Sequence, residues 1–188
     1  MAALGIPYPI FQQAYFVDDL ERAIHEWHRV YGAGPFVIAP HHRCDEFTYR
    51  GTSQEADVSY AFGYLGDTMI QFIVQHDDTP SIYRDMYADG EQGYHHLAYL
   101  VTDFAAERQR LIDLGLEPAC ELFADGVHAS YFDTRHINGG FTEIHGDPPH
   151  ILQAFAEWRR AHQIHRAGDP IIWTRPRSSR EARTSRPS

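Results

Sequence analysis

The sequence contains no lysine, and all 16 of its basic residues are arginine. The missing amino groups exclude enzymes that form a Schiff base through lysine, and they exclude P-loop proteins, whose lysine binds phosphate. Cysteine is scarce as well. Because Cys44 and Cys120 form no C-x-x-C motif and require no disulfide, we interpret both as buried free thiols.

Long apolar runs are also missing. No run approaches the ~20 residues that a membrane-spanning helix requires. The N-terminus lacks a basic region followed by a long apolar stretch, so no secretory signal is indicated. We therefore expect a cytoplasmic protein that has no membrane partner.

Positive charge is concentrated at one end of the chain. Residues 1–173 carry 11 arginines against 25 aspartates and glutamates, a net charge of −14. A body this acidic disfavours nucleic acid as a partner. We interpret residues 174–188 as a disordered arginine-rich tail, with polyanion binding as the alternative. Its arginines are Arg175, Arg177, Arg180, Arg183 and Arg186.

The sequence predicts one order of secondary-structure elements that occurs twice along the chain. Residues 10–17 predict a half-buried strand, residues 18–32 a helix that ends at Gly32, and residues 36–75 several short antiparallel strands. The order then starts again with a strand at 95–102, a helix from Asp103 to Gly115, and three strands within 119–147. The polar stretch between these halves predicts a connecting loop that contains about one helical turn.

A shift of 84 residues aligns the two halves. It places Gln12 on His96, Ala14 on Ala98 and Asp19 on Asp103, and both helices end in G-x-x-P. The fold class that this predicts is α+β, with two paired βαβββ modules that form a curled mixed sheet around a central cavity, plus a C-terminal helix. The expected segments are the modules at 8–75 and 94–148, the loop at 76–93, and the helix with its extension at 149–173.

Each module places one polar residue in its first strand and one in its last. These residues are Gln12 and Gln71 in the first module, and His96 and Glu143 in the second. Paired modules would bring all four into one cavity, where imidazole, carboxylate and amide oxygens could bind a divalent ion such as Zn, Mn, Fe, Ni, Co or Mg. The alternative is that they are hydrogen-bonded core residues.

The phrase "HHLAYLVTDF", residues 95–104, resembles the H-H-[IL]-x-[FY]-x-V-x-D-[LF] phrase of the vicinal oxygen chelate superfamily. That superfamily includes glyoxalase I, methylmalonyl-CoA epimerase, extradiol dioxygenases and the bleomycin- and fosfomycin-resistance proteins. "FQQAYFVDDLERA", residues 11–23, is a weaker match, and the order of elements extends the resemblance over about residues 10–148. The resemblance implies that His96, Glu143 and Gln71 bind metal. Gln12 departs from it, because most metal-dependent members have histidine there.

The resemblance also implies a reaction. We expect a metal-assisted isomerase or lyase of the glyoxalase or epimerase type, which moves a proton through an enolate or enediolate on a small oxygenated acid, ketone or thioester. Glu143 is the expected base. The acids that could supply a second group are Asp45, Glu46, Glu55 and Asp57. The alternative is a non-catalytic protein that sequesters a small molecule. A ring-cleaving dioxygenase is least favoured, because the site lacks a second histidine.

Further residues are candidates for binding the substrate. Arg50 and Arg84 could bind a carboxylate or phosphate, and Tyr131 and His145 are expected near the cavity, since His145 shares a face with Glu143. His95 should face the opposite side of its strand from His96 and serve the structure. The loop residues His41, His42 and Arg43 could contact an anionic substrate or only solvent. A homodimer is the expected assembly.

Overall fold

The computed structural model describes residues 8–174, so the predicted arginine-rich tail lies outside the described residues, Thr174 apart. The elements of the first module are β1 (Ile10–Phe16), α1 (Leu20–Tyr31), β2 (Phe36–His42), β5 (Val58–Leu65) and β6 (Thr68–Gln75). Those of the second are β7 (Gly93–Val101), α2 (Phe104–Asp113), β8 (Pro118–Ala124), β9 (Val127–Asp133) and β10 (Phe141–Gly146). The remaining elements are β3 (Glu46–Tyr49), β4 (Thr52–Ser53), α3 (Arg135–Asn138), α4 (Pro149–Ile164) and β11 (Ile172–Thr174).

The equivalent helices α1 and α2 begin and end alike. The side chain of Asp19 accepts a hydrogen bond from the backbone N–H of Arg22, and Asp103 accepts one from that of Ala106. Each cap satisfies an N–H group that the first helical turn leaves unpaired. Gly32 and Gly115 follow the helices in the left-handed conformation, with φ of 73° and 85°, which glycine adopts without strain.

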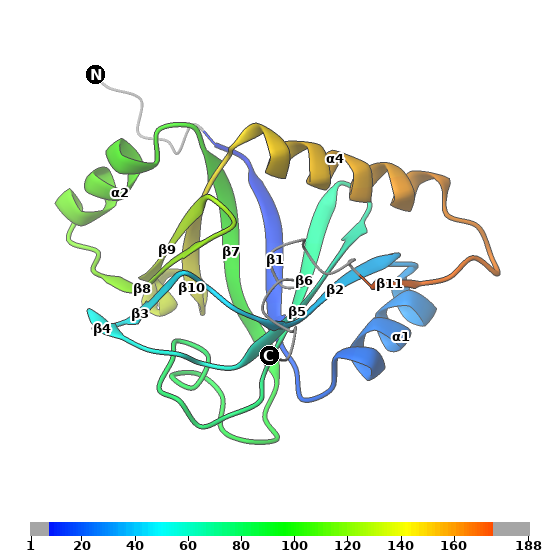
Figure 1. The fold of residues 1–188 in the computed structure, drawn as a ribbon, viewed down its shortest axis with the longest axis horizontal. Helices are drawn as coiled ribbons and strands as arrows, with labels where there is room; N and C mark the ends of the chain where they lie inside the picture. The colour runs from blue at the N-terminus through cyan, green and yellow to red at the C-terminus, as the bar shows by residue number, and fades with distance from the viewer. Residues whose placement is uncertain (1–7, 175–188) are drawn as a thin grey trace, which may run out of the picture.

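Within residues 8–174, one curled sheet of eleven strands joins the modules, in the order β11-β2-β5-β6-β1-β7-β10-β9-β8-β3-β4. β1 and β7 pair antiparallel at its centre, and each runs parallel to the last strand of its own module. Figure 1 shows this central pair flanked by the two modules, with α1 and α2 on opposite sides of the molecule. The predicted α+β fold of two paired βαβββ modules is therefore confirmed.

Three hydrophobic clusters in the described part of the chain hold the layers together. Ile24 of α1 packs with Phe36 and Phe72 on one outer face, and Leu111 of α2 packs with Ile144 on the other. The third cluster lies inside the curl and takes residues from both modules: Phe16, Tyr60 and Ile73 from the first, and Ala129, Tyr131 and Phe141 from the second. Neither module can bury this inner surface alone, so the modules depend on each other.

Two segments between the repeated elements depart from a simple duplication. The β3–β4 hairpin leaves the first module and pairs antiparallel with β8 of the second. The loop at 76–93 contains the expected turn, with hydrogen bonds from Asp85 N–H to Ser81 O and from Tyr87 N–H to Tyr83 O. It also buries Ile82 and Tyr83 completely, so it is part of the core.

The C-terminal helix α4 crosses the first module, as Figure 1 shows along the top of the molecule. Trp158 of α4 stacks on Phe62 of β5, with ring centroids 5.6 Å apart. Near its end, His162 Nδ1 lies 2.6 Å from Gly34 O, and Gly66 N–H bonds to His162 Nε2 at 3.1 Å. These contacts fasten α4 over the inner face of the sheet.

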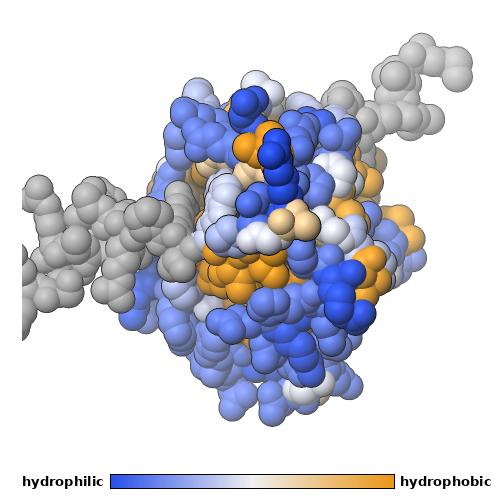
Figure 2. Space-filling view, turned by 90° about the vertical axis from the view of Figure 1, so that its right-hand side faces the viewer, coloured by the Kyte–Doolittle hydropathy of each residue, from blue (hydrophilic) through white to orange (hydrophobic). Residues whose placement is uncertain are grey.

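The surface offers little that identifies a partner. Figure 2 shows the side that carries α1 and β11, where a hydrophobic hollow lies among hydrophilic residues. Exposed apolar side chains on elements of that side include Val30 and Tyr31 of α1 and Trp173 of β11. No helix within residues 8–174 has the length and apolar character needed to cross a membrane. The homodimer stays a prediction.

The register of the central strands places an alanine beside every inward polar residue. Ala14 of β1 lies opposite Gln71 of β6 and His96 of β7. Ala98 of β7 lies opposite Gln12 of β1 and Glu143 of β10. Both alanines are completely buried. Their small side chains leave the space into which the four larger side chains extend.

We predict that Ala98→Val destabilises the fold, because two added methyl groups would overfill this close-packed region. The expected loss is about 1–3 kcal/mol of unfolding free energy, measured by urea denaturation. Ala105→Val, on the exposed face of α2, is the control and should cost at most about 0.7 kcal/mol of helix propensity. Equal losses for the two variants would contradict the tight packing around Ala98.

Candidate active site

The structure brings the four polar residues of the repeated strands together inside the curl. Gln12 Nε2 lies 2.8 Å from Gln71 Oε1, 3.3 Å from His96 Nε2 and 3.5 Å from Glu143 Oε2. His96 Nε2 and Glu143 Oε2 are 3.0 Å apart. All four residues are buried. We call Gln12, Gln71, His96 and Glu143 the tetrad.

A β-bulge places His95 beside the tetrad. Ala14 lies opposite His96 and Tyr15 lies opposite Tyr94, so His95 is the extra residue of β7. The strand alternation that would turn His95 to the opposite face is interrupted at this point. The His95 and His96 rings therefore touch, with their Nδ1 atoms 2.8 Å apart. The sequence prediction that His95 faces away from His96 is corrected here.

This contact determines which nitrogen of His96 carries its proton. His95 Nε2 lies 3.2 Å from Ile82 O, a carbonyl that can only accept, so His95 carries its proton on Nε2. Burial, with a smaller contribution from His96, holds the pKa of His95 well below its usual value, and the ring is neutral. Its Nδ1 must then accept the proton of His96 Nδ1–H. The lone pair of His96 Nε2 consequently faces the tetrad.

Burial disfavours the charged forms of both His96 and Glu143. It lowers the pKa of His96 to about 3. It raises the pKa of Glu143, although His145 and a hydrogen bond from Tyr131 act in the opposite direction. The 3.0 Å contact between these residues therefore joins a neutral imidazole to a carboxyl group rather than two ions. Two lone pairs that face each other at this distance require a proton or a cation between them.

The donors of the tetrad suit a divalent cation. They comprise one imidazole nitrogen, one carboxylate and the amide oxygen of Gln71, and all three surround the amide nitrogen of Gln12. Rotation of the Gln12 amide would turn its oxygen inward as a fourth donor. No arginine within residues 8–174 lines the cavity, and the basic side chains in its lining are the imidazoles of His42 and His145. These observations fit a bound metal ion.

The tetrad opens into a cavity of about 110 Å³. His96 is fully buried behind it, while Gln12, Gln71 and Glu143 form part of its wall. The other side chains that line it are mostly apolar and come from both modules and from α4. They include Tyr60, Phe62, Leu122, Val127, Tyr131, His145, Ile151, Phe155 and Trp158. The cavity is thus a mainly apolar pocket with the tetrad carboxyl and amide groups in its wall.

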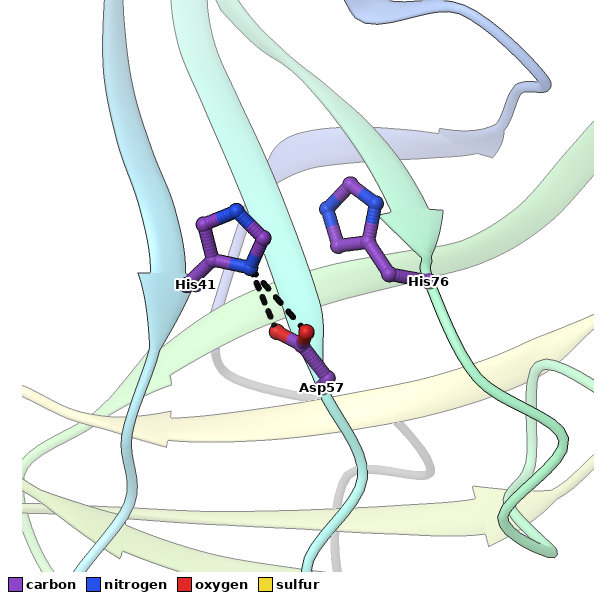
Figure 3. Close-up of side chains that lie close together, drawn as sticks. All are labelled: His41, Asp57 and His76. Atoms are coloured by element: carbon purple, nitrogen blue, oxygen red, sulfur yellow. Dashed lines mark hydrogen bonds and ion pairs between the residues drawn. The ribbon is translucent and has the colours of Figure 1, made fainter.

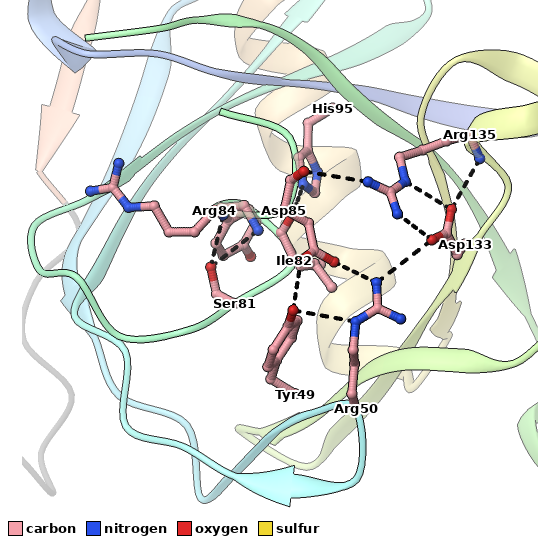
Figure 4. Close-up of polar contacts among 10 residues, drawn as sticks. Tyr49, Arg50, Ser81, Ile82, Arg84, Asp85, His95, Asp133 and Arg135 are labelled. Atoms are coloured by element: carbon pink, nitrogen blue, oxygen red, sulfur yellow. Dashed lines mark hydrogen bonds and ion pairs between the residues drawn. The ribbon is translucent and has the colours of Figure 1, made fainter. Parts of the chain in front are cut away.

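Two of the four residues predicted to bind substrate lie at this cavity. Tyr131 and His145 line it. Arg50 instead pairs with Asp85 at 2.6 Å and with Asp133 at 3.7 Å, as Figure 4 shows. Arg84 donates to the backbone oxygens of Gln75 at 3.4 Å and Asp77 at 3.1 Å. The structure does not bring either arginine to the tetrad.

The predicted second acids also lie elsewhere. None of Asp45, Glu46, Glu55 and Asp57 lines the tetrad cavity, whereas Asp125, in the turn between β8 and β9, does. Sequence reasoning missed Asp125, because a D-G pair between two strands indicates only a hairpin turn. It placed His42 in a loop, but His42 ends β2 and lines the cavity.

We predict that His96 stays neutral between pH 8 and pH 5, with its proton on Nδ1. An unfolded histidine gains a proton near its usual pKa of ~6.5, and folded His96 does so only at about 3. Between these two pH values the unfolded state binds more protons at His96 than the folded state does. His96 therefore lowers the free energy of unfolding as the pH falls below ~6.5, and it does not affect that free energy at higher pH. Nitrogen-15 NMR of the histidine rings measures both properties, with exposed His136 as the reference. A His96 signal that titrates in this range would refute the proton arrangement.

Solved structures support this description of the fold. Methylmalonyl-CoA epimerase from Mycobacterium tuberculosis is similar with a TM-score of 0.54 and 17% identity, over 81% of this chain and 97% of that one. A hypothetical protein from Bacillus halodurans also scores 0.54, at 13% identity over 76% and 96%. A variant of the Streptomyces coelicolor methylmalonyl-CoA epimerase scores 0.52, at 17% identity over 75% and 95%. At such identities the likeness concerns the fold alone.

Sequence comparison identifies the family. No curated protein sequence matches the chain. One family model does match, over residues 11–132, and this range includes both helices of the repeat and the first strand of each module. The chain therefore belongs to the Glyoxalase/Bleomycin resistance protein/Dioxygenase superfamily.

Proposed function

We propose that this protein is an isomerase or lyase of the glyoxalase or epimerase type, which moves a proton at a carbon next to a carbonyl group. The observation that carries the proposal is the buried carboxyl group of Glu143. It faces an apolar cavity, its pKa is raised by burial, and the lone pair of His96 Nε2 lies 3.0 Å away. A carboxylate with a raised pKa is a stronger base than an exposed one.

In this proposal His96, Glu143, Gln71 and Gln12 would hold a divalent metal ion. When bound, such an ion would polarise the substrate carbonyl and make the neighbouring C–H group more acidic. Glu143 takes up the proton and returns it. The hydrogen bond from Tyr131 orients the Glu143 carboxyl group, and the aromatic wall of the cavity keeps water away from it.

The cavity favours an uncharged substrate group. Its lining includes the carboxyl groups of Asp125 and Glu143 and the imidazoles of His42 and His145, and no arginine within residues 8–174. Without a bound ion, a free carboxylate would find no arginine there with which to pair. The cavity volume of about 110 Å³ is also below the ~300–1,000 Å³ of a site for a drug-sized ligand. A small ketone, hydroxyketone or thioester end with an apolar substituent fits these properties best.

The structural relatives suggest epimerisation, and the cavity lining also suits proton transfer by a single base. Several of them are methylmalonyl-CoA epimerases, whose named substrate carries a carboxylate. Epimerisation also needs proton exchange on both faces of a carbon, and Asp125 is the one further carboxylate in the lining. A proton shuttle through the single base Glu143, as in isomerisation or elimination, requires no second acid.

Sequestration of a small apolar molecule is the second candidate. The observation that favours it is the Gln12 amide, which already bonds to Gln71 and fills the space between the other donors. Phe62 stacks on Trp158, and Phe155 lies tilted against Trp158; this aromatic wall would bind an aromatic molecule without any metal.

Proton exchange with solvent tests the proposed chemistry on a panel of small carbonyl compounds. We expect the protein to catalyse deuterium incorporation next to the carbonyl of at least one uncharged ketone or thioester, followed by proton NMR in D₂O. Glu143→Gln should lower that rate by about 10²–10⁴-fold, because it removes the base without changing the shape. Glu157→Gln, on the surface of α4, should leave the rate unchanged. Equal rates in both variants would contradict the role of Glu143.

Metal analysis separates the enzyme from the binding protein. We expect at least one equivalent of metal in protein purified without added metal, and one equivalent less in His96→Ala and in Glu143→Ala while the fold is retained. Gln12→His should tighten metal binding by on the order of 10–100-fold, because an imidazole is a stronger donor than an amide. Wild-type metal content in either alanine variant would refute the site. Full binding of an aromatic ligand in excess chelator would support sequestration.

A further inference from the structure

A second group of metal-binding side chains lies outside the tetrad cavity. His41 is near the end of β2, Asp57 directly precedes β5, and His76 directly follows β6. These three strands are neighbours in the sheet, so three segments distant in sequence meet at one end of the first module. Figure 3 shows the two imidazoles and the carboxylate grouped there.

The distances within the group are short. His41 Nδ1 lies 2.8 Å and 3.1 Å from the two carboxylate oxygens of Asp57. The ring centroids of His41 and His76 are 4.6 Å apart. One nitrogen from each imidazole and one carboxylate oxygen all lie within 4.8 Å of one another. Among residues 8–174, no other set of at least three histidine, cysteine, aspartate or glutamate side chains meets this criterion.

We propose that His41, Asp57 and His76 form a binding site for a transition-metal ion, with Zn²⁺ as its most suitable occupant. Two imidazoles and one carboxylate suit zinc, cobalt, nickel or copper, whereas calcium and magnesium prefer oxygen ligands alone. Ligands of a tetrahedral ion at ~2.1 Å are about 3.4 Å apart. Small rotations of these side chains would reach that spacing, and the exposed His41 and partly exposed Asp57 have room to make them.

The backbone and Ser59 hold the group in place. Buried Ser59 accepts a hydrogen bond from His41 N–H at 2.9 Å, and its hydroxyl lies 2.7 Å from His76 Nε2. The backbone N–H of His76 donates to Asp57 O at 2.8 Å. All three ligands are therefore fixed to one rigid end of the sheet, which lowers the entropy cost of ordering them around an ion.

The site is separate from the tetrad but close to the residues that shape its cavity. None of His41, Asp57 and His76 lines the tetrad cavity. His41 and Asp57 line a neighbouring cavity that shares His42 and Tyr60 with it. A metal ion would link the ends of β2, β5 and β6. It would thereby hold these strand ends in place next to His42 and Tyr60, which the two cavities share.

Titration of the chelator-treated, full-length protein with Zn²⁺ tests the proposal, with the histidine ring nitrogens followed by NMR. The His41 and His76 signals should shift together with one midpoint, and the exposed His25 and His136 signals should not follow it. His76→Ala should raise the midpoint of the His41 shift at least about tenfold, because one of three ligands is lost. His136→Ala is the matched control and should leave the midpoint unchanged.

Two results would overturn the proposal. One is a His41 shift with the same midpoint in His76→Ala as in the wild type, since His41 would then bind the ion without His76. The other is a common midpoint for all exposed histidines, which would indicate surface binding without a defined site. Because the readout is the ring signal of each histidine, the result does not depend on catalysis or on metal at the tetrad.

Discussion

The antiparallel pairing of β1 with β7 is the constraint on which the rest of the molecule depends. It joins two modules that cannot bury their inner faces separately, and its register determines what meets inside them. Ala14 and Ala98 occupy the two small positions at the pair, and the tetrad surrounds them. A slip of one residue would turn these alanines outward and separate the four polar side chains.

The loop between the modules connects the surface of the protein to the tetrad. Asp85 accepts hydrogen bonds from Tyr49 and Arg50 through its carboxylate, and from Arg135 through its backbone oxygen. These contacts hold the loop whose Ile82 carbonyl meets His95 (Figure 4). Since His95 determines the proton position on His96, arginines that do not line the cavity help to hold the hydrogen-bond arrangement at the tetrad.

Much of the fold was predictable because its signals are local or repeated. The equivalent helices begin and end where the sequence indicates, after Asp19 and Asp103 and before Gly32 and Gly115. The 84-residue repeat predicted which polar residues meet. The features that were not predictable depend on tertiary contacts. The bulge at His95 follows from strand pairing, the β3–β4 hairpin joins the other module, and the ion pairs of Arg50 involve two distant segments. Propensity and periodicity contain no information about such contacts.

The pairing of the β3–β4 hairpin with the second module also affects how two copies of the chain could associate. A sheet made only of the two modules would end at β2 and β8, both seven residues long, with unpaired backbone groups open to another chain. In this protein β11 covers β2, and the β3–β4 hairpin covers β8. Within residues 8–174, the strands at the two ends have three and two residues. Such short edges resist strand addition, which favours association of two copies through helices, loops or side-chain surfaces over extension of one continuous sheet.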